Sequence, residues 1–131
     1  MSEISEKWGN IVSSHGFTQI PNALFFLNKY ATDEMKICPT EMIILLQLLS
    51  SWWQKNKMPF LSMKTISEKS SISERQVQRA IKSLELKGYI KKEKKTEKGI
   101  IASNIYDLLP LVEKLNIISE HVSTNHKRTI K

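Results

Sequence analysis

The sequence predicts a mainly α-helical fold with a small β-hairpin, an α+β class, and three observations support it. Apolar residues recur at helical spacing over most of the chain, short polar turns separate these segments, and β-compatible segments flank residues 96–99. A chain of 131 residues is long enough for one domain with a real core and too short for two ordinary ones. We therefore expect one helical domain that carries a hairpin.

Composition narrows the class of protein. Hydrophobic residues make up 40% of the chain and charged residues 25%, which is typical of a globular domain. The first ten residues lack the pattern of a secretory signal, and apolar runs such as residues 42–46 are far shorter than the roughly 20 residues of a membrane span. The single cysteine, Cys38, allows no internal disulfide and fits a reducing compartment. We expect a cytoplasmic protein that does not contact membranes.

Residues 1–36 are predicted to form an N-terminal helical extension that packs on the core. A short amphipathic helix is expected over residues 3–14. Its apolar residues at helical spacing are Ile4, Trp8, Ile11 and Val12. Pro21 then suits the first position of a second helix, over residues 22–30.

The strongest helix-start signal lies at residues 38–41, where Pro39 suits the first helical position and Glu41 the positive first turn. The helix that begins here, over residues 40–55, is predicted to be the centre of the core. Its apolar face is expected to comprise Met42, Leu45, Leu46, Leu49, Trp52 and Trp53, widened by Ile43 and Leu48. A turn and a very short strand are expected at residues 57–61.

Two short capped helices follow. Ser62 is predicted to cap the first, over residues 63–69, and Ser73 the second, over residues 74–87. Ser73 and Gln76 are spaced as a capping box, in which each side chain bonds the backbone of the other residue. A three-residue turn separates the two helices.

Gly88 ends the second helix and leads into the predicted hairpin, whose strands are residues 89–94 and 100–106. A C-terminal helix is expected over residues 107–118, capped by its first residue. Its apolar residues on one side are Leu108, Leu111, Val112, Leu115 and Ile118. The polar residues 119–131 are predicted to be a flexible basic tail.

Helix, three-residue turn, helix and hairpin, in this order, make up a winged helix-turn-helix, which we place at residues 37–106 with extra helices on both sides. Residues 61–100 hold eleven of the twenty Lys and Arg residues but only five of the thirteen acidic ones. A localised basic excess favours a polyanionic partner, because each phosphate contact releases a condensed counterion. We expect this partner to be double-stranded DNA, which would make the protein nucleoid-associated.

The second helix of the motif is predicted to enter the major groove as the recognition helix. Its apolar face comprises Val77, Ala80, Ile81 and Leu84. Arg side chains match the O6 and N7 atoms of guanine, and Gln side chains match the N6 and N7 atoms of adenine. Because a recognition helix presents its N-terminal half to the groove, we predict base reading by Arg75, Gln76, Gln78 and Arg79, and a phosphate contact by Lys82.

Further DNA contacts are predicted around this helix. Hydroxyls and free backbone N–H groups at helix starts commonly meet phosphates. Such contacts are expected from Lys64, Thr65, Ser71 and Ser73. The hairpin, over residues 89–106, is the predicted wing. It is expected to lay Lys91, Lys92, Lys94, Lys95 and Lys98 along the neighbouring backbone or minor groove.

Residues 37–92 resemble the bacterial winged helix-turn-helix domains of plasmid and phage replication proteins and related transcriptional regulators. The resemblance is carried by the helix opening PTE and by the later string SERQVQRAIKSLELKGYI. Two positions depart from the pattern, since Ser71 stands where the family usually has Gly and Gln76 where it often has Thr. The resemblance implies DNA binding and leaves the choice between transcription and replication open.

Several functions remain open on the sequence alone. We favour a sequence-specific transcriptional regulator, with a plasmid or phage replication initiator or accessory factor as the alternative. A winged helix used as a protein-interaction module is a second alternative. Binding of RNA or single strands is weaker, because the motif offers only Tyr89 and Tyr106 as stacking residues.

The sequence gives no indication of an enzyme or a metal site. It has no Gly-rich phosphate loop, nucleophile elbow or paired carboxylates at a pocket-forming site. The potential metal ligands His15, His121, His126 and Cys38 are scattered without ligand spacing. We therefore expect no metal, no cofactor and no small-molecule ligand.

The terminal helices carry more apolar residues than a minimal winged helix needs. They are predicted to form a homodimer, which would set two recognition helices about one DNA turn apart on a palindromic site.

Overall fold

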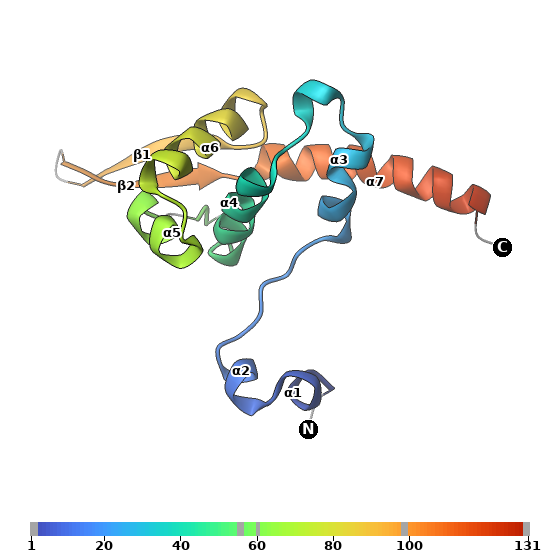
Figure 1. Ribbon diagram of the computed structural model, residues 1–131, viewed down its shortest axis with the longest axis horizontal. Helices are drawn as coiled ribbons and strands as arrows, with labels where there is room; N and C mark the ends of the chain where they lie inside the picture. Colours follow the sequence, from blue (N-terminus) through green and yellow to red (C-terminus); the bar gives the residue numbers. More distant parts are fainter. Residues whose placement is uncertain (1–2, 55–56, 60, 98–99, 130–131) are drawn as a thin grey trace.

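The computed structural model describes residues 3–54, 57–59, 61–97 and 100–129, and all of their side chains except those of residues 94–104 and 123–129 (Figure 1). Its helices are α1 (Glu3–Trp8), α2 (Asn10–Ser14), α3 (Leu27–Tyr30), α4 (Pro39–Ser50), α5 (Met63–Ser70), α6 (Glu74–Leu86) and α7 (Leu109–Thr129), with 3₁₀ turns η1 (Asn22–Phe26) and η2 (Asp33–Met35). Strands β1 (Lys91–Glu97) and β2 (Ile100–Asp107) pair antiparallel. The predicted fold class is confirmed. No helix of the described ranges is both long and apolar enough to cross a bilayer.

The core lies between α4, α6 and the first half of α7, and η1 and α3 close one side of it (Figure 1). Its fully buried side chains come from every part of the chain after residue 23. They include Leu24, Leu27, Ile44, Leu45, Leu48, Ile66, Ile81, Leu84, Tyr89, Tyr106 and Leu108. The prediction that the helix after Cys38 forms the centre of the core is confirmed.

Helix α4 is shorter than predicted. It ends at Ser50, where the N–H groups of Ser51 and Trp52 bond the carbonyls of Leu48 and Leu49 in a tightened last turn. Trp52 is half-buried against the core, whereas Trp53 points outward and is 86% exposed. The expected apolar face is therefore confirmed for Trp52 and wrong for Trp53, as it is for Ile43, which is 38% exposed.

The caps of α5 and α6 are confirmed atom by atom. The Ser62 hydroxyl accepts a hydrogen bond from the Thr65 N–H at 3.0 Å, and the Ser73 hydroxyl accepts one from the Gln76 N–H at 3.1 Å. Gly88 ends the helix pair at φ +79°, a left-handed conformation that favours glycine. The caps thus fix both ends of the second helix.

The hairpin also forms where it was predicted, and Lys91 pairs with Asp107 in its register. Tyr89 and Ile90, expected to begin its first strand, lie before β1 and are buried in the core. The Tyr106 N–H donates to the Pro59 carbonyl at 2.9 Å. This contact and an isolated bridge between Gln54 and Lys57 stand in place of the very short strand predicted nearby.

Helix α7 continues to Thr129, so the predicted end of the C-terminal helix at residue 118 is wrong. The Leu109 N–H bonds the Asp107 carboxylate at 2.9 Å and starts the helix. Neither glycine nor proline occurs after Pro110 to stop it, and adding residues to an anchored helix is easy compared with starting one.

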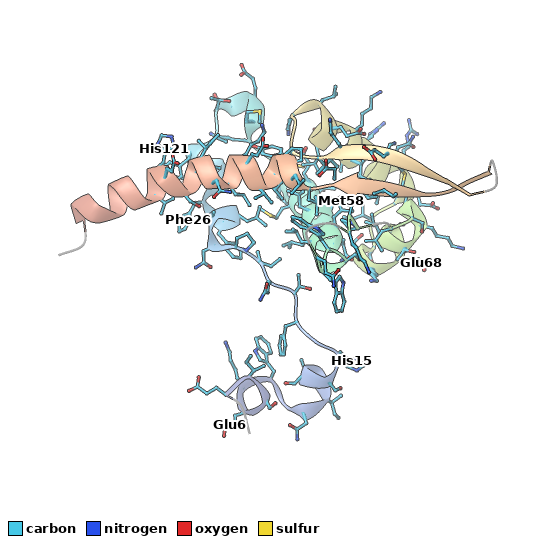
Figure 2. All side chains as sticks on the ribbon, turned by 180° about the vertical axis from the view of Figure 1, so that it is seen from behind. Glu6, His15, Phe26, Met58, Glu68 and His121 are labelled. Carbon is cyan, nitrogen blue, oxygen red and sulfur yellow. The ribbon has the colours of Figure 1, made fainter. Side chains whose placement is uncertain are left out.

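The N-terminal segment divides into two parts. We expected residues 1–36 to pack on the core as one extension, but within the described chain only the part from Ile20 onward does so. Gly9, at φ +87°, splits the predicted helix into α1 and α2. Their apolar side chains are exposed to between 49% and 79% and are Ile4, Trp8, Ile11 and Val12. Figures 1 and 2 show this pair of helices apart from the body of the molecule, joined to it by an extended stretch.

Candidate nucleic-acid interface

Helix α6 separates its side chains cleanly into two faces. Val77, Ala80, Ile81 and Leu84 are buried against the core. Arg75, Gln76, Gln78, Arg79 and Lys82 are all exposed. Because the buried residues follow a helical period, α6 has one possible orientation on the core, and its polar side chains share the solvent side. The structure therefore brings the five predicted residues of the recognition helix onto one surface.

Gln76 has a second role within α6. Its side-chain oxygen accepts hydrogen bonds from the N–H and the hydroxyl of Ser73, both at 3.3 Å. These contacts complete the capping box, so the Gln76 oxygen and the Ser73 hydroxyl are engaged within the helix start. The Gln78 side chain has no such contact among the described residues.

The turn between α5 and α6 bends at Ser71. This residue has φ +58° and ψ +30°, in the left-handed region. Ser71, which the sequence comparison singled out as a serine in place of the usual glycine, takes a backbone conformation that favours glycine. A non-glycine residue in this conformation carries a strain of about 1 kcal/mol. The exposed Ser71 side chain lies at the junction of the two helices.

The remaining predicted contacts lie on α5 and the hairpin. Lys64 is exposed near the start of α5, and the Thr65 hydroxyl shares a 2.9 Å hydrogen bond with the Ser62 hydroxyl. On β1, Lys91 is exposed and Lys92 half-buried. Lys94 and Lys95 belong to β1, but their side chains lie outside the described ones, and Lys98 lies outside the described residues. A break in the pairing register falls between Lys95 and Thr96.

The positive charges of this surface are available to a ligand. Among the described residues, the ion pairs are Lys36–Asp33 and Lys87–Glu41. Arg75, Arg79 and Lys82 are therefore not neutralised by a described carboxylate. Figure 1 shows the hairpin projecting beyond the helices on the α5–α6 side, opposite to the direction of α7. Helix α6 and strand β1, which carries several lysines, thus lie at the same end of the molecule.

Sequence reasoning missed an ionic contact at the other end of α6. Lys87 bonds the Glu41 carboxylate, and Glu41 is only 3% exposed. The sequence analysis predicts for Glu41 only a favourable place in the positive first turn of its helix. A signal was present, because Glu41, Leu45 and Leu48 are spaced i, i+4 and i+7 and therefore share the buried face.

Hydrogen bonds keep Glu41 ionised in its buried position. Burial by itself raises the pKa of this carboxyl, but hydrogen bonds from the Cys38 N–H, Lys87 and Ser83 outweigh it, and the pKa falls below its ordinary value. Burial and the nearby Glu41 charge raise the pKa of Tyr89. Glu41 is therefore charged at neutral pH.

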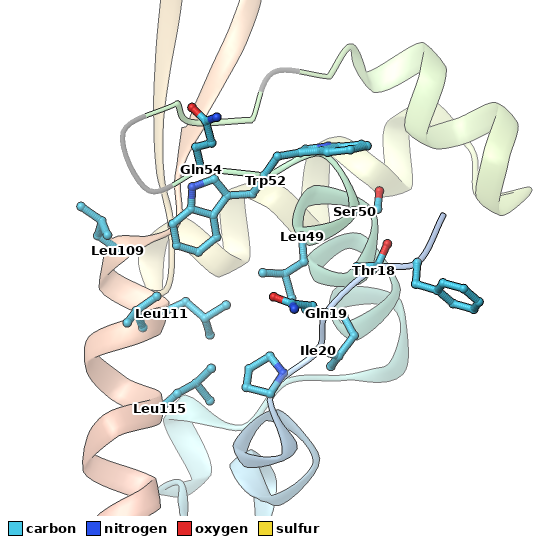
Figure 3. A pocket seen from close by; sticks show the side chains of 14 residues that line it. Thr18, Gln19, Ile20, Leu49, Ser50, Trp52, Gln54, Leu109, Leu111 and Leu115 are labelled. Carbon is cyan, nitrogen blue, oxygen red and sulfur yellow. The ribbon is translucent and has the colours of Figure 1, made fainter. Parts of the chain in front are cut away.

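A hollow of about 830 Å³ lies on another side of the domain (Figure 3). It is bounded by the extended residues 17–21, the end of α4 and the start of α7. Leu49, Trp52, Leu111 and Leu115 give it a largely apolar wall. No sequence pattern predicts this hollow, because its walls come from three separate segments.

Part of this chain also matches a known family. Residues 36–90 match the family model of a helix-turn-helix domain. Among solved structures, the chain is similar to the adhesin competence repressor AdcR from Streptococcus pyogenes, with 19% identity, a TM-score of 0.43, and coverage of 97% of this chain and 77% of that chain. No curated protein matches the sequence significantly. The matched segment spans α4, α5, the turn and α6, and together with the hairpin it has the arrangement of a winged helix-turn-helix.

Proposed function

We propose that this protein is a transcriptional regulator that recognises a specific sequence in double-stranded DNA. In this proposal α6 lies in the major groove, and the hairpin, residues 89–106, lies along the backbone or the minor groove. The observation that carries it is the exposed row of Arg75, Gln78, Arg79 and Lys82 on a helix whose other face is fixed in the core. Held in this way, the row keeps one orientation toward a groove.

The roles within the row follow from side-chain chemistry and position. Arg75 and Arg79 lie one turn apart in the first half of α6 and bear planar donor forks that suit guanine. Gln78 suits adenine. Gln76 can make the bidentate contact with adenine only if its side-chain oxygen gives up the bonds from Ser73, so we rank it below the other three. Lys82, further along, is placed for a phosphate.

Phosphate contacts are proposed for the residues around α6. Lys64 and Thr65 lie in the first turn of α5, and Ser71 and Ser73 lie just before α6. Free N–H groups and hydroxyls at helix starts favour anions. The wing lysines are Lys91, Lys92, Lys94, Lys95 and Lys98. Contacts of this kind set affinity and register and carry no sequence information directly.

A selection of bound fragments from random duplex DNA, read by sequencing, tests the proposal. We expect one enriched motif for the wild type. Replacing Arg75 and Arg79 together with Ala is expected to abolish the enrichment and to reduce the slope of log affinity against log salt. Lys7→Ala, which removes an exposed cation from α1, is the matched control and should leave both unchanged.

The same experiment separates the alternatives. Unchanged affinity and salt slope in the double variant contradict DNA binding through α6 and favour a protein-interaction module. Motifs that map to single promoter sites support a transcriptional regulator. Motifs that map to iterated arrays support a replication initiator or accessory factor instead.

We also propose that the protein is a homodimer. The residues Leu108, Leu111, Leu115 and Ile118, first expected to supply the contact, are buried in their own core. On the described part of the terminal helices, the exposed apolar surface comes from α1 and α2 and from Ile117, which is 57% exposed on α7. Light scattering is expected to give twice the 15.2 kDa of one chain, and Trp8→Glu with Ile11→Glu is expected to return it to one. A wild type that scatters as one chain at micromolar concentration contradicts this dimer.

A further inference from the structure

The C-terminal end of the recognition helix is fastened to the segment that precedes α4. The ammonium group of Lys87 donates to the Lys36 carbonyl at 2.8 Å and to the two Glu41 oxygens at 2.9 and 3.0 Å. Two residues later, the Tyr89 hydroxyl donates to the Met35 carbonyl. These contacts join parts of the chain about fifty residues apart. The C-terminal end of α6 therefore has fixed partners in α4 and in the segment just before α4.

Glu41 is the centre of this connection. It is 3% exposed, and one of its oxygens also accepts the Cys38 N–H at 2.8 Å. A single carboxylate thus bonds the first turn of α4 on one side and the last turn of α6 on the other. Lys87 is 22% exposed at its side chain, so the bond is shielded from solvent and from salt.

We propose that Glu41 is a positioning residue for DNA recognition, which sets the tilt of α6 and thereby its discrimination between DNA sequences. The inference rests on the proposed function of α6. Glu41 is buried and acts on DNA only through its contacts with α6 and its C-cap, those of Ser83 and Lys87.

Helix geometry explains why a contact at one end of α6 affects base reading at the other. The 13 residues of α6 span about 20 Å, so a tilt of about 5° at Lys87 moves its N-terminal end by roughly 2 Å. Hydrogen bonds to base edges weaken steeply when distance and angle change. Attraction to phosphates falls off slowly with distance. Loss of the Glu41 bond should therefore impair specificity more than general affinity.

Glu41→Gln tests this inference with little change of shape. The amide oxygen of Gln still accepts the Cys38 N–H, while the charge that holds Lys87 is gone. Asp33→Asn is the matched control, because it removes the carboxylate of the exposed Lys36–Asp33 pair in the same region, where Asp33 is 96% exposed. A second variant combines Glu41→Gln with Lys87→Met, so that no unpaired charge is left near the core and folding is preserved.

The readout is the ratio of the affinity for the selected DNA site to the affinity for an unrelated duplex of equal length. Circular dichroism at the assay temperature establishes that each variant is folded. We expect about a tenfold lower ratio in both Glu41 variants, with the affinity for unrelated DNA and its salt slope unchanged. Asp33→Asn should keep the wild-type ratio.

Two results overturn the inference. One is a wild-type ratio in the folded double variant, and the other is an equal loss of affinity for both duplexes, which marks a purely structural role. Failure of the proposed function gives a different result. In that case the Arg75 and Arg79 replacements leave DNA binding unchanged, and the wild type itself has equal affinity for the two duplexes.

Discussion

The helices of the helix-turn-helix, α5 and α6, differ from the N-terminal helices α1 and α2 in whether they pack on the core. All four carry apolar residues at helical spacing, and none exceeds 13 residues. Helices α5 and α6 begin at serine caps and bury their apolar faces, whereas α1 and α2 leave theirs exposed. At the start of α2 the capping position is Gly9, which has no side chain to offer. An amphipathic pattern thus predicts a helix, and a partner surface decides whether that helix joins the core.

The largest expected effect is a difference in stability between apolar truncations in α6 and in α2. Ile81→Ala in α6 removes a side chain that is 1% exposed and is expected to lower the free energy of unfolding by about 3 kcal/mol. Ile11→Ala in α2, at 79% exposure, is expected to change it by less than about 0.5 kcal/mol. Urea denaturation of the two variants beside the wild type measures both values. Equal losses would show that α2 is packed in solution.

The contact between Glu41 and Lys87 at the C-terminal end of α6 should make the stability of the protein depend on pH. The folded-state pKa of Glu41 lies below its ordinary value of 4.5, so its contribution to stability is present above that pH and is lost as the pH falls through the folded pKa. The free energy of unfolding should therefore fall less between pH 7 and pH 3 in Glu41→Gln than in the wild type. Identical pH dependence would contradict the ion pair with Lys87.

The caps give a smaller effect. Ser73→Ala removes the acceptor for the Gln76 N–H and is expected to cost about 1 kcal/mol of stability. Asn10→Ala at the start of α2, where no side chain caps the helix, is expected to be nearly neutral. Thermal unfolding followed by circular dichroism distinguishes the two. A loss from the Asn10 change would indicate a cap that forms in solution.

The smallest effect concerns the turn. Ser71→Gly relieves the left-handed strain at φ +58°, and after the entropy of glycine in the unfolded chain a gain of about 0.5 kcal/mol is expected. Ser70→Gly, inside the last turn of α5, is the matched control and should destabilise. A loss of stability from the Ser71 change would show that its side chain makes a contact worth more than the strain.

Where sequence reasoning succeeded, the signals were local. Ser62, Ser73 and Gly88 act through their own backbone neighbours, so the positions of α5, α6 and the turn follow from residue type alone. The end of α4 at Ser50 was mispredicted, because residues 51–54 contain no helix breaker and the choice depends on how Trp52 packs. Helix α7 is longer than predicted, because the polar residues after Ile118 suggest the end of a helix although they continue it to Thr129.

The candidate site shows the same division. The exposed row on α6 follows from its 3.6-residue period and was found directly. The bond between Lys87 and Glu41 joins residues 46 positions apart and depends on the way α4 meets α6. Contacts of that kind need the tertiary structure, although the spacing of Glu41 from Leu45 gives a hint of its burial.

The extended stretch between α2 and η1 has a practical consequence. Phe17, Thr18 and Gln19 are exposed and belong to no helix or strand, and a protease needs an accessible, extended backbone of this kind. Brief digestion is expected to cut here first and to release a fragment that begins near Ile20 and keeps the whole core. Such a fragment would lack the exposed aromatic and aliphatic residues of α1 and α2, which makes it a good candidate for crystallisation and for NMR at high concentration.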